Sequence, residues 1–153
     1  MDYEIEVKNV SPQPVVSIRA RCKPTAIKET LSDLLPSSFT HVMAKGKHPA
    51  GPPFTRFHRY TPDEVEVEGG CPVTEHVDGD GRVKAGELPG GEVAATVHVG
   101  PYETLSEAYS ALEAWVKLNG RRQKGPPWEV YLTDPGQETD PGRWKTQILM
   151  PIE

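Results

Sequence analysis

The chain is poor in several features that mark particular protein classes. Its 153 residues include two cysteines, Cys22 and Cys71, too few for a disulfide framework, so we expect reduced thiols. No apolar run approaches the ~20 residues that a transmembrane helix needs, and the opening MDYEIEVKN lacks the features of a signal peptide. Seventeen basic residues face 22 acidic ones, a net charge of −5, so a nucleic-acid-binding surface is not indicated. These absences predict a cytoplasmic globular protein that contacts neither nucleic acid nor membrane directly.

Proline is abundant, with 16 residues, and predicts many short strands and loops. Helical periodicity occurs in two segments and predicts helices at about 25–35, ended by Pro36, and at about 103–118. Strand patterns are predicted at Glu4–Val10, Val15–Arg21, Pro53–Tyr60, Val65–Glu68, Glu92–Val99, Trp128–Thr133 and Lys145–Met150.

The sequence also contains an internal repeat. Gly51-Pro-Pro-Phe54 recurs as Gly125-Pro-Pro-Trp128, and similar blocks lie upstream and downstream in the same order. Chance recurrence of Gly-Pro-Pro turns is the alternative, but three co-ordered blocks favour a duplication. We therefore expect one α+β domain of two strand-helix-strand-strand units with pseudo-two-fold symmetry. Repeat 1 would span about 1–76, a connector about 77–87, and repeat 2 about 88–153. Their antiparallel sheet would carry both helices on one face.

Alternation along residues 128–133 separates an apolar set from a polar set. Trp128, Val130 and Leu132 are predicted to face the helices, and Glu129 and Tyr131 to point away from them. The repeat places Thr55 and Phe57 at the positions equivalent to Glu129 and Tyr131. A carboxylate in an aromatic cleft can pair with a flat cation or act as a general base. The alternative is that Glu129 is an ordinary solvated strand residue.

Metal and cofactor signatures are weak. The segment from His76 to Glu87 spaces Asp78 and Asp80 like a calcium loop, but His76 takes the first ligand position and flanking helices are not predicted. A surface turn is the preferred interpretation. The five histidines show no zinc spacing, and no nucleophile elbow or phosphate loop is present. We expect neither a metal nor a cofactor.

Several short motifs together resemble a known family. They are Gly91…His98-Val-Gly100-Pro101-Tyr102, Leu105…Tyr109…Trp115…Gly120, Pro127-Trp-Glu129-Val-Tyr131, and Thr146…Pro151-Ile152, with Gly51-Pro-Pro-Phe54 and Glu68…Pro72-Val73 in the first half. Their order resembles a GyrI-like domain, also called the AraC effector-binding domain, over nearly the whole chain. The resemblance implies a ligand cleft between the repeats, in which the Glu of the x-Glu-x-Tyr strand, here Glu129, meets cationic or drug-like ligands.

The resemblance leaves more than one function open. A free-standing binding module would sequester bulky aromatic, hydrophobic or cationic molecules, whereas a small hydrolase would open cyclopropane-bearing genotoxins with Glu129 as general base. The third option is an effector-sensing or gyrase-inhibitor-like protein that acts through an unknown protein partner. A helix-turn-helix is not expected, because the first strand begins in the opening residues. The expected catalytic residues are Glu129, Tyr131 and Tyr102. The expected ligand contacts are Thr55, Phe57, Tyr102, Trp128, Glu129 and Tyr131, and Tyr109 is expected in the core.

Overall fold

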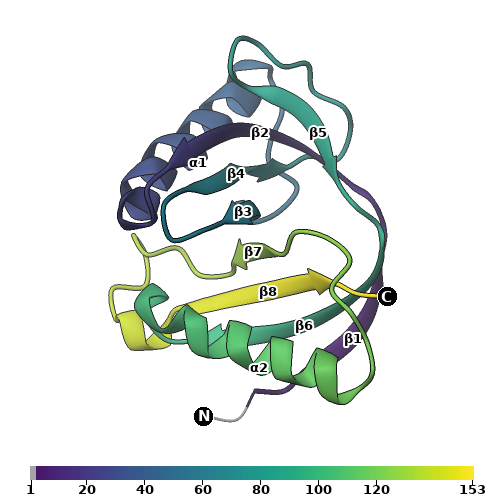
Figure 1. Cartoon of the computed structure of the whole chain (residues 1–153). Coiled ribbons are helices and arrows are strands. Elements are labelled where there is room, and N and C mark those ends of the chain that lie inside the picture. Colours follow the sequence, from purple (N-terminus) through teal and green to yellow (C-terminus); the bar gives the residue numbers. More distant parts are fainter. Residues whose placement is uncertain (1–2) are drawn as a thin grey trace. The chain divides into compact units, whose positions relative to one another are not determined.

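The computed structural model describes residues 3–153, which form two compact units. The N-terminal unit is Ser11–Gly90. The C-terminal unit is Gly91–Glu153 together with the chain's first segment, which ends at Val10. Each unit is an antiparallel sheet with one long helix (Figure 1). The predicted α+β class is therefore confirmed.

The N-terminal unit has the strand order β3-β4-β2-β5. Its core lies between helix and sheet, where Leu34 and Val42 of the helix are fully buried. The elements are β2 (Gln13–Cys22), η1 (Pro24–Ala26), α1 (Ile27–Ala44), β3 (Phe54–Tyr60), β4 (Val65–Pro72) and β5 (Lys84–Leu88).

The C-terminal unit has the strand order β1-β6-β8-β7. In its core, Leu105, Ala108 and Leu112 of the helix pack in one cluster with Ile148 and Met150 of the sheet. The elements are β1 (Glu6–Val10), β6 (Gly91–Val99), η2 (Tyr102–Thr104), α2 (Leu105–Leu118), β7 (Trp128–Tyr131), η3 (Pro141–Arg143) and β8 (Lys145–Pro151).

Both units follow the same strand-helix-strand-strand path, as the repeat predicts. In the N-terminal unit it runs β2-α1-β3-β4 with β4 between β3 and β2, and in the C-terminal unit β6-α2-β7-β8 with β8 between β7 and β6. Each unit also has an added edge strand, β5 beside β2 and β1 beside β6. The chain's first strand thus pairs with the second repeat, since Val10 lies opposite Gly91.

The expected end of the first helix at Pro36 is wrong. Helix α1 continues through Pro36 to Ala44. Proline removes one helical hydrogen bond and costs about 3 kcal/mol in a helix interior. Here Pro36 is exposed, and the buried stripe continues beyond it through Ser38 and Val42. Burial of Val42, together with the hydrogen bond from the Ser38 hydroxyl to the Gly69 carbonyl, offsets the hydrogen bond lost at Pro36.

Residues 77–87 are more than a surface connector. Val77 and Val83 are buried in the core of the N-terminal unit, and β5 begins at Lys84. The guanidinium of Arg82 donates to both carboxylate oxygens of Asp33 on α1, at 2.7 and 2.8 Å. Of the calcium-like residues, Asp80 begins a tight turn that closes at Val83, in which Gly81 takes a φ of +60°. None of the helices described in residues 3–153 is long and apolar enough to cross a membrane.

Candidate functional site

Strand β7 places Glu129 on the helix-bearing face of its sheet, opposite to the prediction. Glu129 lies opposite Ile148 in the register with β8, and Ile148 belongs to the core that packs on α2. Trp128 lies opposite Leu149 and points to the other face. Both Trp128 and Glu129 are only 4% exposed. Because both faces of this strand are buried at this point, apolarity could not show which face meets the helix.

Two phenols hold the Glu129 carboxylate. The Tyr109 hydroxyl, from α2, donates to Oε1 at 2.8 Å, and the Tyr131 hydroxyl, from β7, donates to Oε2 at 2.8 Å. Tyr109 lies on the apolar stripe of α2, packed against the core as expected, but its hydroxyl reaches the carboxylate. The helical stripe therefore predicted that Tyr109 packs against the core, but it gave no sign that the Tyr109 hydroxyl contacts Glu129.

Burial dominates the electrostatics of this group. Burial raises the pKa of Glu129, and the hydrogen bonds from Tyr109 and Tyr131 only partly oppose that shift. The pKa of Tyr109 is raised well above its ordinary value, first by burial and then by the Glu129 charge. Within residues 3–153, no Lys, Arg or His forms an ion pair with Glu129. In the described part of the chain, the site therefore holds a buried acid that two neutral phenols solvate and that no cationic side chain neutralises.

Aromatic rings continue from the phenols. Tyr102 meets Tyr131 edge-to-face, with ring centroids 5.7 Å apart, and stacks on Trp144 at 4.8 Å. The indole N–H of Trp144 donates to the Glu138 carbonyl at 2.7 Å, which fixes the ring. Burial also raises the pKa of Tyr102. Trp144 was missed because it follows two Asp-Pro-Gly turns and carries no motif of its own.

A further polar atom lies on this face. Thr146 is opposite Tyr131 in the register of β7 and β8. Its hydroxyl oxygen is buried and has no hydrogen-bond partner among residues 3–153. Buried polar atoms are nearly always hydrogen-bonded, so an unpaired one beside a buried acid favours a ligand-binding role for this face.

The remaining predicted residues lie elsewhere. Thr55 and Phe57 belong to β3 of the N-terminal unit, where Thr55 is buried opposite Gly69 and Phe57 packs against the core. A side chain at Gly69 would touch Leu34 of α1, so Thr55 and Phe57 share the α1 face. Within their own unit they occupy the positions that Glu129 and Tyr131 occupy on the α2 face. The structure thus brings Glu129, Tyr131 and Tyr102 together, adds Tyr109 and Trp144, and places Trp128 on the opposite face.

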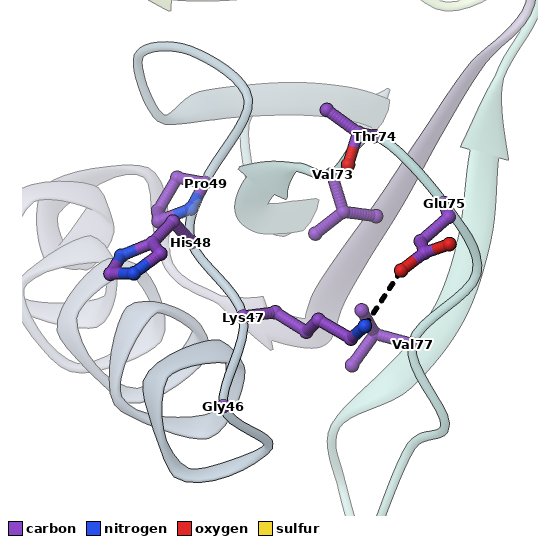
Figure 2. Close-up of a pocket in the computed structure, with 8 residues that line it drawn as sticks. All are labelled: Gly46, Lys47, His48, Pro49, Val73, Thr74, Glu75 and Val77. Carbon is purple, nitrogen blue, oxygen red and sulfur yellow. Dashed lines mark hydrogen bonds and ion pairs between the residues drawn. The ribbon is translucent and has the colours of Figure 1, made fainter.

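A separate surface hollow of about 280 Å³ lies between the end of α1 and the segment after β4 (Figure 2). Its main polar contact is the exposed ion pair between Lys47 Nζ and Glu75, at 2.7 Å. In the described part of the chain, no cluster of three His, Cys, Asp or Glu side chains could hold a metal ion. This hollow offers neither a buried charge nor an aromatic wall.

Comparison with known proteins identifies the family. The GyrI-like small molecule binding domain matches residues 3–153. The chain belongs to this family. It is therefore a small-molecule binding domain, as the resemblance predicts. No curated protein sequence matches the GyrI-like chain significantly.

Solved structures share its fold. The EcmrR C-terminal domain is 26% identical, with a TM-score of 0.89, over 100% of this chain and 99% of that domain. The EcmrR chain in the EcmrR–DNA complex is 25% identical, with a TM-score of 0.88. The match covers 99% of this chain but only 57% of the EcmrR chain. A hydrolase encoded by lin2189 from Listeria innocua is 14% identical, with a TM-score of 0.74, covering 98% of this chain and 92% of that one. SAV2435 bound to tetraphenylphosphonium is 12% identical, with a TM-score of 0.71, covering 100% and 94%. For the last two, the likeness shows the fold alone.

The raised pKa of Glu129 predicts a pH-dependent stability. Because the folded protein holds this proton more tightly than the unfolded chain, the contribution of Glu129 is most favourable below the unfolded-state pKa of about 4.3. It is lost as the pH rises through the folded-state pKa, at a slope of at most about 1.4 kcal/mol per pH unit. We expect Glu129→Gln to gain stability relative to the wild type across this window and to level off above it. Urea denaturation of both proteins from pH 4 to pH 9 measures the difference. A difference that is constant with pH would show that folding does not raise the pKa of Glu129.

Proposed function

We propose that the domain binds bulky aromatic cations through Glu129. The observation that supports this is the buried carboxylate with no ion-pair partner among residues 3–153. An ionised acid in a low-dielectric site is costly, and a bound cation offsets that cost. The rings of Tyr102, Tyr131 and Trp144 add the flat, electron-rich faces that attract such cations. Tetraphenylphosphonium, present in the SAV2435 structure, has this chemistry.

Sequestration or detoxification of such compounds is the role that we propose for this domain. Effector sensing through a protein partner is the alternative, because the related EcmrR domain is part of a protein seen in complex with DNA. Both roles would use the same binding site. They differ in whether occupancy changes the affinity for a partner protein.

Calorimetric titration with tetraphenylphosphonium tests the proposal. A cation beside Glu129 favours the ionised carboxylate, so binding lowers the pKa and releases a proton when the pH is near the free-state pKa. We expect saturable one-site binding whose heat differs between buffers of unequal ionisation enthalpy. Triphenylphosphine oxide, a neutral aromatic comparator, should bind more weakly and release no proton. Equal affinity for the cation and the neutral compound would reject the cationic assignment.

A second candidate, hydrolysis of strained cyclopropane compounds, is favoured by one observation. A carboxylate whose pKa is raised, with phenols beside it, has the pair of groups that general acid–base catalysis requires. Glu129 would accept a proton from water while the water oxygen bonds to a cyclopropane carbon and a ring C–C bond breaks. The electron pair of that bond would pass to the conjugated carbonyl oxygen, to which Tyr102 or Tyr131 would donate a proton. Mass spectrometry of a cyclopropane-bearing panel would detect a product heavier by one water. We expect Glu129→Gln to slow its formation by about 10²–10⁴-fold. If no compound gives this product, the hydrolase candidate is rejected and only the binding function remains.

A further inference from the structure

A second charged cluster lies in the N-terminal unit, on the sheet face opposite α1. Glu68 of β4 lies opposite Arg56 of β3 and Arg19 of β2, so one row crosses three strands. The next residue, Gly69, lies against α1, since a side chain there would touch Leu34. Because side chains alternate along a strand, the row with Glu68 points away from the helix.

Glu68 gives both carboxylate oxygens to other partners. The Ser17 hydroxyl donates to Oε2 at 2.6 Å, and His58 Nε2 lies 2.6 Å from Oε1. Glu68 is therefore placed opposite Arg56 without hydrogen bonding to it. Arg19 pairs instead with Glu66, at 3.0 Å.

Arg56 is left with unmet hydrogen-bonding capacity. Its Nε is buried and has no hydrogen-bond partner among residues 3–153. Burial and the nearby charge of Arg19 lower the pKa of Arg56, and only the Glu68 charge opposes them. Buried donors without partners are rare in proteins, and a charged one is especially costly. Two guanidinium groups flanking an already bonded carboxylate favour an additional anion.

The local charge has the sign that an anion requires. Five basic residues share this face with two acidic ones, a balance of +3 in a chain of net charge −5: they are Arg19, Arg21, Arg56, Arg59 and Lys84, against Glu66 and Glu68. Arg19, Arg21 and Glu66, with Ala20, also line a surface hollow of about 270 Å³. Space for a small ligand therefore lies beside the row.

We propose that this face is an oxyanion site that takes a phosphate group, with Arg56 as its bidentate anchor and Arg19 as the second cation. The planar guanidinium fork presents parallel N–H donors to two oxygens of one phosphate, which an ammonium group cannot do. Arg56 supplies the buried Nε–H donor, and Arg19, whose side chain is more exposed, supplies the second positive charge. The residues of this site belong to the N-terminal unit, whereas Glu129 and its aromatic neighbours belong to the C-terminal unit.

Phosphate titration of the intact chain tests this site, with ionic strength held constant by chloride. Backbone amide NMR shifts report the location, and thermal melting reports the affinity. We expect inorganic phosphate or glycerol 3-phosphate to shift amides of β2, β3 and β4 and to raise the melting temperature. Saturation by the ester alone would identify a phosphomonoester as the ligand.

Four variants make the result specific to the row. Arg56→Lys keeps the charge without the fork and should weaken binding at least fivefold, and Arg56→Met should weaken it at least tenfold. Arg19→Gln, at a more exposed position, should weaken it about threefold and serves if the Arg56 variants do not fold. Arg143→Gln, an exposed arginine of the other unit, should leave affinity unchanged. The proposal would be overturned if neither inorganic phosphate nor glycerol 3-phosphate bound, if all variants bound equally, or if chloride alone had an equal effect.

Discussion

Glu129→Gln is expected to weaken tetraphenylphosphonium binding by about 2–4 kcal/mol, the usual cost of removing one member of a buried charge pair. That is roughly a 30- to 1,000-fold rise in Kd. Glutamine keeps the shape and volume of the side chain, and its carbonyl can still accept one phenol hydrogen bond. It removes the negative charge that balances the ligand. Calorimetry of wild type and variant at the same pH measures the change.

Three controls isolate the charge at this position. Glu113→Gln makes the same change at an exposed position on α2 and should leave affinity within about twofold. Tyr131→Phe removes one hydroxyl while keeping the ring and the charge, so we expect a loss of only about 1 kcal/mol. Triphenylphosphine oxide should bind wild type and Glu129→Gln alike. If Glu129→Gln keeps full cation affinity while an aromatic substitution abolishes it, the ring faces bind the ligand without a counter-charge.

Much of the architecture was predictable because it depends on local patterns. The apolar stripe along α2 and the recurrence of Gly-Pro-Pro before β3 and β7 predicted the two strand-helix-strand-strand units. Pro36 misled the prediction for α1, because the cost of a proline is local while the burial of Ser38 and Val42 depends on tertiary packing. Strand β5 was missed because Lys84–Leu88 is short and contains a glycine, and its partner β2 lies far away in the sequence.

Within the candidate site, the grouping of residues along β7 was predictable, but the face to which they belong was not. Alternation correctly grouped Glu129 with Tyr131, because it depends only on the pleat of the strand. Assigning that group to a face required the register with β8, which the sequence of β7 does not contain. The contact from Tyr109 depends on where α2 packs against the sheet. A single sequence without its tertiary packing carries no signal for such a contact.

Gly70→Ala is expected to be among the most destabilising single-atom additions in the N-terminal unit. Gly70 lies in β4 between Ser17 of β2 and Phe54 of β3. A Cβ there would come within 2.0 Å of the Val16 carbonyl oxygen and 2.7 Å of the Ser17 Cα. Both are backbone atoms, so neither can rotate away, and the strands would have to separate. We expect a loss of about 3 kcal/mol, near the upper end for overpacking.

Thermal and urea denaturation of this variant should show the loss directly. A loss of that size lowers the Tm by about 6–12 °C for a domain of this length. Gly86→Ala is the matched control, because a Cβ at that position of β5 would meet only Val15 Cγ2 at an ordinary 3.8 Å. It should change the free energy of unfolding by less than about 1 kcal/mol. If the two alanine variants were equally stable, β2 and β4 would be able to move apart at Ser17, and the close approach of their backbones would not be what requires glycine at position 70.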